Sequence, residues 1–300
     1  MKPEDFCFPH IKQTFSDVNA LRTAYTVSCI VAIPFLLTSI VGNFIMLFCL
    51  WKCRSLHPPF KALLRSLVLS DLGVGLVVQP LFLASNYTAL TKNMNSFCVI
   101  HVVYNTIGYF IAAVSFVTTT SIALDRFFAI QLRIRYRQFA TLRKTFTLLA
   151  FIWVLCAFLS SVWIWNLALH RIFRDTLLTS CITIACVSYI RVFMLVRQYQ
   201  AGFNANRVQG NATFHLGRYK KTVSSTIYVF VFLLLCYTPY LCLSVAARRS
   251  GQNTTLSLWV HISLVFVFAN SSFNPALYSW RIPEVRQIAR ETFGKHFCKI

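Results

Sequence analysis

The chain has 300 residues, of which 57% are hydrophobic and only 12% are charged, a composition too apolar for a single soluble core to bury. It therefore describes a membrane protein. The net charge of +21 would suit a nucleic-acid partner, but the cations lie between apolar segments and form no basic stripe, which argues against nucleic acid. Residues 1–23 contain no apolar run typical of a signal peptide, so we expect them to remain as an extracellular segment.

Seven segments have the roughly 20 apolar residues that a helix needs to cross a bilayer. They are residues 24–51, 61–85, 98–125, 145–168, 173–198, 222–247 and 257–280. Short loops and the absence of internal repeats predict an all-α membrane protein, with one seven-transmembrane helix bundle over residues 24–280. Residues 281–300 follow as a short amphipathic helix on the membrane surface and a cytoplasmic tail, with basic side chains available to lipid headgroups.

The positions of the basic residues predict the orientation. Of the 29 Lys and Arg, 21 fall in four regions that share one side of the membrane, which makes that side cytoplasmic. The N-terminus is then extracellular, the C-terminus is cytoplasmic, and a multi-pass plasma-membrane protein is expected. Asn86 and Asn253 lie outside in Asn-x-Thr triplets and are candidate glycosylation sites, although such triplets also occur by chance.

Adjacent ionisable residues, Asp125 and Arg126, stand at the inner end of the third span, where such groups are costly unless they have a function. The alternative for a lone arginine is that it only extends to the membrane interface. Ser115 lies eleven residues earlier, on nearly the same helix face and about 16 Å further out. Asp71 is the only carboxylate in the middle of any span.

Polar residues also follow the seventh span, where Asn270, Asn274 and Tyr278 step by four beside Pro275. Proline removes a backbone hydrogen bond, and this spacing places the three side chains on one stripe. Together with Asp71 they could form a hydrated cage for a cation or proton. Packing between helices explains the serine and asparagine residues as well, but it does not explain Asp71.

Short motifs, one in each span, give the chain a family resemblance. They are Gly42-Asn43, LVLSDL (67–72), Asp125-Arg126-Phe127, Trp153, YIRVF (189–193), Cys236-Tyr237-Thr238-Pro239 and Asn274-Pro275-Ala276-Leu277-Tyr278. In this order they resemble a rhodopsin-like (class A) G-protein-coupled receptor over essentially the whole chain. The resemblance implies a receptor that passes the binding of an extracellular ligand to a cytoplasmic heterotrimeric G protein.

The resemblance also implies roles for individual residues. Asp125 restrains Arg126 at rest, and Arg126 meets the G protein in the active state. The tyrosines expected to turn inward on activation are Tyr189 and Tyr278. The expected hinge residues are Tyr237, Pro239, Asn274 and Pro275. The expected sodium ligands are Asp71, Ser115, Asn270 and Asn274. No cofactor is then required, and Na⁺ is expected as an allosteric ligand.

Some residues depart from the family pattern. Phe127 stands where tyrosine is usual, and His101 stands where the third span usually carries a cysteine. The segment 166–175 is short and has no cysteine, so the usual disulfide to this loop cannot form. The short loop, its lack of a cysteine and Cys181 in place of the usual proline of the fifth span resemble the branch that contains melanocortin, adenosine and lysophospholipid receptors, melanocortin most of all. Cys7 and Cys98 are the two cysteines expected outside, as a disulfide or as two free thiols.

The expected ligand site lies at the outer face of the third span. Its candidate residues are His101, Asn105 and Tyr109, with Tyr237, Tyr240 and Phe268 opposite them. Ordinary helix packing explains any one of them equally well. Gly108 stands where amine receptors carry a carboxylate and Phe268 where a lysine would hold retinal, which argues against both. Four arginines near the opening favour a neutral, lipid-like or acidic ligand, with surface anchoring as the alternative: Arg171, Arg174, Arg248 and Arg249.

Two expectations concern the cytoplasmic side. The foot of the sixth span reads Arg218-Tyr219-Lys220-Lys221 where many family members have an acid, which leaves Asp125 as the expected partner of Arg126 and predicts raised basal signalling. Cys298 is a candidate for palmitoylation, or else a free thiol.

Two other functions fit the sequence less well. A seven-span transporter would be expected to show inverted repeats or paired broken helices. An intramembrane hydrolase would need a nucleophile with its base or a metal-binding set, and the sequence has neither HExxH nor GxSxG. The chain is therefore not expected to be an enzyme.

Overall fold

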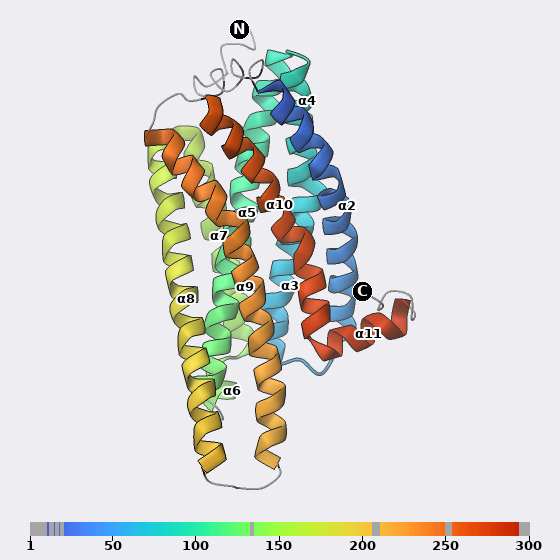
Figure 1. Ribbon diagram of the computed structural model, residues 1–300, viewed down its shortest axis with the longest axis vertical. Helices are drawn as coiled ribbons and strands as arrows, with labels where there is room; N and C mark the ends of the chain where they lie inside the picture. The colour runs from blue at the N-terminus through green and yellow to red at the C-terminus, as the bar shows by residue number, and fades with distance from the viewer. Residues whose placement is uncertain are drawn as a thin grey trace. The chain divides into compact units, whose positions relative to one another are not determined.

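Every regular element that the computed structural model describes is helical (Figure 1). The described residues are 11, 15, 18, 21–132, 135–205, 211–249 and 254–293. Within them, seven helices are long and apolar enough to cross a membrane. The predicted all-α, seven-span fold is therefore confirmed.

The helices follow the predicted spans closely along the chain. They are α2 (Arg22–Lys52), α3 (Pro58–Gly73), η2 (Val74–Val78), α4 (Gln79–Leu90), α5 (Met94–Leu132), α6 (Tyr136–Phe139), α7 (Leu142–Trp165), α8 (Leu167–Ala205), α9 (Asn211–Arg249), α10 (Thr254–Arg281) and α11 (Pro283–Phe293). The short helix α11 turns away from the end of α10 (Figure 1). It begins at Pro283 and buries Val285 while Arg290 is exposed, as expected of an amphipathic helix.

The connection between the fourth and fifth spans is shorter than predicted. Helix α7 ends at Trp165, and Asn166 is the only residue between α7 and α8, with extended backbone (φ −147°, ψ 97°). The Asn166 Oδ1 atom accepts a hydrogen bond from the Leu169 amide at 3.0 Å. Asparagine is a strong N-cap residue, so it starts α8 at once. The predicted boundaries at residues 168 and 173 were therefore wrong.

The second span is one continuous membrane-length segment built from α3, η2 and α4. The π-helical turn η2 lies directly before Gln79 and Pro80. Proline cannot donate its backbone hydrogen bond, and π-turns typically occur as single insertions within α-helices. The extra residue in this turn changes which side chains share a face above Asp71.

The chain forms two compact units. The first comprises Met1–Asn43, Ser70–Ala112 and Phe232–Phe273, and the second comprises Phe44–Leu69, Ala113–Val231 and Asn274–Ile300. Within the first unit, α2 is hydrogen-bonded to both of its partner segments: Ser39 Oγ donates to the Asp71 carbonyl at 3.0 Å, and Asn43 Nδ2 donates to the Ser271 carbonyl at 3.0 Å. In the second unit Trp153 Nε1 donates to Ser66 Oγ at 3.1 Å.

Two glycines in the first unit differ in the space around them. A Cβ atom at Gly75 would lie 2.9 Å from Ile40 Cγ1, 3.1 Å from Ser39 Oγ and 3.2 Å from the Ile40 backbone nitrogen. A Cβ atom at Gly108 would come no closer than 3.6 Å to its neighbour Val78. The absence of a side chain at Gly75 therefore allows α2 to approach closely. At Gly108 there is room for a Cβ atom, so no close approach depends on that glycine.

We expect Gly75→Ala to destabilise the protein by about 1–3 kcal/mol, because overpacking forces the backbone of α2 to shift. The matched variant Gly108→Ala should be neutral or stabilising, since alanine favours a helix by about 1 kcal/mol over glycine. Melting temperatures of the two purified variants in one detergent measure the difference. Equal melting temperatures would contradict the close approach at Gly75.

Candidate functional site

The charged pair at the inner end of α5 lies in the second unit and is buried. Arg126 is 6% exposed, and its Nε donates to Asp125 Oδ2 at 3.0 Å, with Nη2 donating to the same oxygen. An unpaired buried charge costs about 3–5 kcal/mol. Arg126 therefore does not extend to the interface as a lone arginine would, and its predicted pairing with Asp125 is present.

The other carboxylate oxygen of Asp125 is bound from the loop that follows α5. Tyr136, at the start of α6, donates its hydroxyl to Asp125 Oδ1. The Tyr136 ring packs against His57, with ring centroids 5.1 Å apart. Burial lowers the pKa of His57, although Asp125 acts in the opposite direction, so the neutral form of this imidazole is favoured. Both oxygens of Asp125 are thus engaged.

A second restraint on Arg126 comes from the beginning of α3. The guanidinium carbon of Arg126 lies 3.7 Å from the centroid of the Phe60 ring, and Phe60 is 1% exposed. A cation over an aromatic face is stabilised by about 2 kcal/mol when the pair is desolvated. Phe60 is therefore a restraint on Arg126 that the sequence analysis did not predict, beside the expected pairing with Asp125. The side chains of residues 218–221 lie outside the described residues.

Sequence reasoning missed Phe60, Tyr136 and His57. The available signals were an aromatic hydroxyl in the short loop eleven residues after Asp125 and an aromatic residue directly after Pro58-Pro59. Neither residue has a spacing that selects it as a partner of Arg126. Only the folded loop brings Tyr136 to the carboxylate.

The other predicted switch and hinge residues are buried. In the second unit, Tyr189 packs on Phe230 with ring centroids 5.2 Å apart, and Asn274 and Tyr278 are 2% and 1% exposed. In the first unit Tyr237 is 8% exposed. Pro239 and Pro275 lie inside α9 and α10, as expected of hinge positions.

The predicted sodium ligands divide between the two units. Asp71 and Asn270 belong to the first unit, and Ser115 and Asn274 belong to the second. All four side chains are at most 3% exposed. Among the described residues, Ser115 Oγ and Asn270 Oδ1 have no hydrogen-bond partner, which fits oxygen atoms suited to a hard cation. In the first unit, the carboxylate of Asp71 and the amide oxygen of Asn270 are donor groups that fit a hard cation.

The six predicted ligand-site residues all belong to the first unit. His101 Nδ1 is 3.0 Å from Ser85 Oγ on α4, and Asn105 Nδ2 donates to the His101 carbonyl at 2.9 Å. Phe268 packs against Phe82 with ring centroids 5.0 Å apart. Tyr109 and Tyr240 are half-buried. His101 thus ties α5 to α4 at the outer end, where the family's usual disulfide is missing.

Another polar cluster in the first unit was not predicted. His261 on α10 lies between the rings of Tyr25 and Phe82, at centroid distances of 4.2 and 5.6 Å. Its Nε2 atom is 3.0 Å from Ser28 Oγ and 3.5 Å from Asn86 Nδ2. The sequence signal was a polar residue in the outer third of three different spans. It was too weak to select these residues from others of the same kind.

Comparison with known proteins agrees with this geometry. The family model described as "7 transmembrane receptor (rhodopsin family)" matches residues 42–182. The crystal structure of squid rhodopsin has the same fold, with a TM-score of 0.77 over 90% of this chain and 85% of that chain, at 19% identity.

Curated relatives extend the match along nearly the whole chain. Adenosine receptor A3 of Ovis aries is 24% identical over 90% of this chain and 91% of its own length. The chain is thus similar to the rhodopsin family of seven-transmembrane receptors. Histamine H2 receptor of Cavia porcellus is 24% identical over 92% of this chain and 81% of its own length. Melanocortin receptor 4 of Danio rerio is 23% identical over 85% of this chain and 80% of its own length. Receptors named for three different ligands thus match almost equally well.

The structure overturns one predicted modification of the receptor. Asn86 is 3% exposed inside α4, and its Nδ2 atom donates to Ser28 Oγ and Cys29 Sγ, each at 3.5 Å. A glycan would have to be attached to this same nitrogen, which is buried against α2. Glycosylation of Asn86 is therefore wrong. Asn253 lies outside the described residues.

The cysteine predictions are partly resolved. Cys98 is disulfide-bonded, while the other eight described cysteines are free, so its partner is not among the described residues. Cys7 and Cys298 also lie outside them. The predicted pairing of Cys98 with Cys7 stays a prediction.

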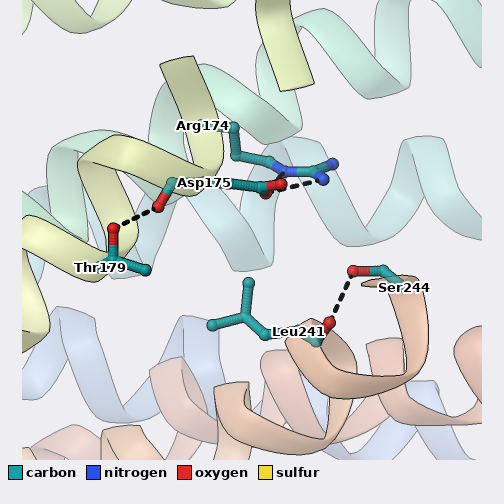
Figure 2. A network of polar contacts seen from close by, with 5 residues as sticks. All are labelled: Arg174, Asp175, Thr179, Leu241 and Ser244. Carbon is teal, nitrogen blue, oxygen red and sulfur yellow. Dashed lines mark hydrogen bonds and ion pairs between the residues drawn. The ribbon is translucent and has the colours of Figure 1, made fainter. Parts of the chain in front are cut away.

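One of the four arginines expected near the ligand opening is neutralised by its neighbour. Arg174 Nη2 lies 3.0 Å from Asp175 Oδ1, and the Asp175 carbonyl accepts a hydrogen bond from Thr179 at 2.8 Å (Figure 2). This adjacent carboxylate reduces the positive charge available to a ligand. The side chain of Arg248 lies outside the described residues. The expected preference for an acidic ligand is therefore weaker than the arginine count indicates.

We expect Phe60→Leu to raise basal G-protein activation. Loss of about 1–2 kcal/mol of cation–π stabilisation shifts an equilibrium roughly 5- to 30-fold towards released Arg126. Ligand-free nucleotide exchange at matched surface expression measures the effect. Phe60→Tyr, which keeps the ring, should behave as wild type, as should Phe146→Leu at an exposed position of α7. Equal basal exchange in Phe60→Leu and wild type would show that the ring does not restrain Arg126.

Proposed function

We propose that the receptor has its N-terminus outside the cell and activates a heterotrimeric G protein through Arg126. The buried pairing of Arg126 with Asp125 carries this proposal, because it places a fixed cation at the end of a span that the positive-inside rule makes cytoplasmic. Ligand binding shifts the population from the paired arrangement towards one in which Arg126 meets the G protein.

The structure supports a resting state held by several weak restraints. Asp125 and Phe60 contact the Arg126 guanidinium, and Tyr136 binds the other carboxylate oxygen of Asp125. A ligand must bind the active arrangement about 10⁴-fold more tightly to move the equilibrium from 1:99 to 99:1. Every missing restraint lowers that requirement, so basal signalling reports on each of them. The sequence predicts raised basal signalling because the foot of the sixth span lacks an acid that would restrain Arg126. How far basal signalling rises depends on how well Phe60 and Tyr136 restrain the Arg126–Asp125 pair in place of that acid.

The proposed ligand contacts aromatic side chains in the first unit. Phe82, Tyr104 and Phe268 belong to one buried cluster with Ala32, Val74, Val78 and Ile111. Around the proposed contacts the ring surfaces are extensive, and His101 and Asn105 already have internal hydrogen bonds. These features support a neutral or lipid-like ligand that is recognised mainly by apolar and aromatic contact.

A sodium ion at Asp71 is proposed as an allosteric ligand. The carboxylate is 0% exposed in the middle of a span, where a counter-charge stabilises its ionised form. Asn270 supplies a neutral oxygen in the same unit. The ion needs no role in chemistry, because it acts only by favouring one arrangement of the receptor. Membrane lipid is the proposed partner of α11.

We expect Arg126→Ala to reduce agonist-independent nucleotide exchange on purified G protein to the level of receptor-free membranes. The side chain that meets the G protein would be absent, while the fold should survive because Asp125 keeps Tyr136 as a partner. Exchange is measured with a panel of G-protein classes in membranes that carry equal amounts of receptor.

The two other functional classes give different results in the same membranes. A transporter would accumulate substrate without any G protein, and an intramembrane hydrolase would release product. Wild-type receptor that promotes no exchange with any G-protein class, at confirmed surface expression, would overturn the proposal. Phe151→Leu, which changes an exposed side chain of α7, is the control for expression and folding.

A further inference from the structure

His57 connects two of the segments that restrain the charged pair at the inner end of α5. It directly precedes α3, and its carbonyl accepts a hydrogen bond from the Lys61 amide at 3.0 Å. Two prolines follow it and fix the backbone of the first turn. Phe60 comes next, 3.7 Å from the guanidinium carbon of Arg126. One rigid turn therefore carries both His57 and the aromatic contact to Arg126.

The ring of His57 contacts the loop that follows α5. It packs on the Tyr136 ring, with centroids 5.1 Å apart and 43° between the ring planes. Tyr136 is buried, and its hydroxyl donates to Asp125 Oδ1. The other end of α6 is held by Phe139, which packs on Phe128 with ring centroids 5.2 Å apart. His57 therefore supports the Tyr136 ring while the hydroxyl reaches the carboxylate.

The surroundings of His57 favour a neutral ring while Arg126 is paired. Burial is the largest influence and lowers the pKa of the imidazole. Asp125 raises this pKa, while Arg126 of α5 and Arg137 of α6 lower it. The charged form needs a proton on both ring nitrogens, yet the buried Nδ1 atom has no hydrogen-bond partner among the described residues. An unpartnered nitrogen disfavours the charged form further.

Release of Arg126 changes this balance. When the guanidinium leaves to meet the G protein, the buried carboxylate of Asp125 loses its counter-charge, which is strongly destabilising. The same movement removes a cation that opposes a proton on His57, while the attraction of Asp125 remains. An imidazolium at this position then compensates the charge of the carboxylate. The alternative is that Asp125 itself takes up the proton.

We propose that activation of the receptor is coupled to the uptake of one proton from the cytoplasm by His57. At rest the neutral ring is a positioning group, because it acts on Asp125 through Tyr136. In the active arrangement the charged ring replaces Arg126 as the counter-charge of Asp125. Because the active arrangement binds one more proton, acid favours it, by about tenfold per pH unit at most. This inference rests on the proposed function of Arg126.

The pH profile of ligand-free nucleotide exchange tests the coupling. Purified full-length receptor in lipid nanodiscs is assayed with purified G protein between about pH 8 and about pH 6, which spans the ordinary imidazole pKa of about 6.5. His57→Phe keeps a ring against Tyr136 but cannot take up a proton, so its exchange should stay at the resting level. On acidification, wild-type exchange should rise about fivefold or more relative to this variant. The comparison at each pH cancels the pH dependence of the G protein itself.

Two further measurements separate the ring from its proton. His57→Ala, which lacks the ring, should show raised exchange with a flat profile relative to His57→Phe. Melting of the nanodiscs without G protein gives a readout that does not depend on signalling. Because burial lowers the pKa of His57 below that of the unfolded chain, wild type should lose stability relative to His57→Phe as the pH falls below about 6.5. The two should melt alike at about pH 8.

Four results would overturn the proposal in distinguishable ways. Equal rises of exchange in wild type and His57→Phe would assign the proton to another group, such as Asp125. Resting exchange in His57→Ala would show that the ring does not position Tyr136, and identical melting profiles would show that His57 does not titrate. No exchange by wild type at any pH would overturn the proposed function and the coupling with it, even where the melting difference persists. Phe146→Leu, at an exposed position of α7, is the control for folding.

Discussion

The cost of a polar group without a partner in hydrocarbon is the constraint on which this structure depends. Long helices satisfy their own backbone groups, so the remaining problem lies with polar side chains inside the spans. Most of those described either bond to the carbonyl one turn earlier, as Thr119 does to Ser115, or join two helices, as Ser39 and Asn43 do. Among the described residues, the groups that do neither include those of Gln79 and Asn270 in the first unit and of Ser115 in the second. These are the positions where a small polar ligand has the largest effect on stability.

The same constraint explains the arrangement around Arg126. A buried guanidinium and carboxylate stabilise each other, yet their mutual attraction rarely offsets the loss of water unless further contacts are made. Tyr136 supplies a hydrogen bond to the free carboxylate oxygen, and Phe60 supplies an aromatic face for the cation. Because the contacts made by Tyr136 and Phe60 are individually weak, a modest change in either segment favours release of Arg126 from Asp125. Such a centre is stable enough to define a resting state and weak enough to be switched.

The sequence was sufficient to predict what depends on local pattern. Apolar length placed the seven spans, and the Asp125-Arg126 pair and the Asn274-Pro275 motif were recognised from adjacent residues. The single-residue connection at Asn166 was missed because apolar composition continues across it, while the cap that starts α8 depends on one side chain. The burial of Asn86 was missed because its triplet has the same form whether the amide faces water or α2. Partners such as Phe60 and Tyr136 come from distant segments, and no spacing rule connects them with Arg126.

The π-turn shows how one local change alters the use of an entire helix. Without the extra residue, Gln79 and Asn86 would rotate by about 100° relative to Asp71, and the outer polar face would no longer point in the same direction as the acid. Pro80 fixes the position of the turn, since its missing N–H removes one backbone hydrogen bond directly after η2. Close contact of Gly75 with α2 then keeps the two helices near enough for Ser39 to bond the Asp71 carbonyl. A proline and a glycine, neither of which contacts an ion, thereby determine which polar side chains share a face with the buried carboxylate.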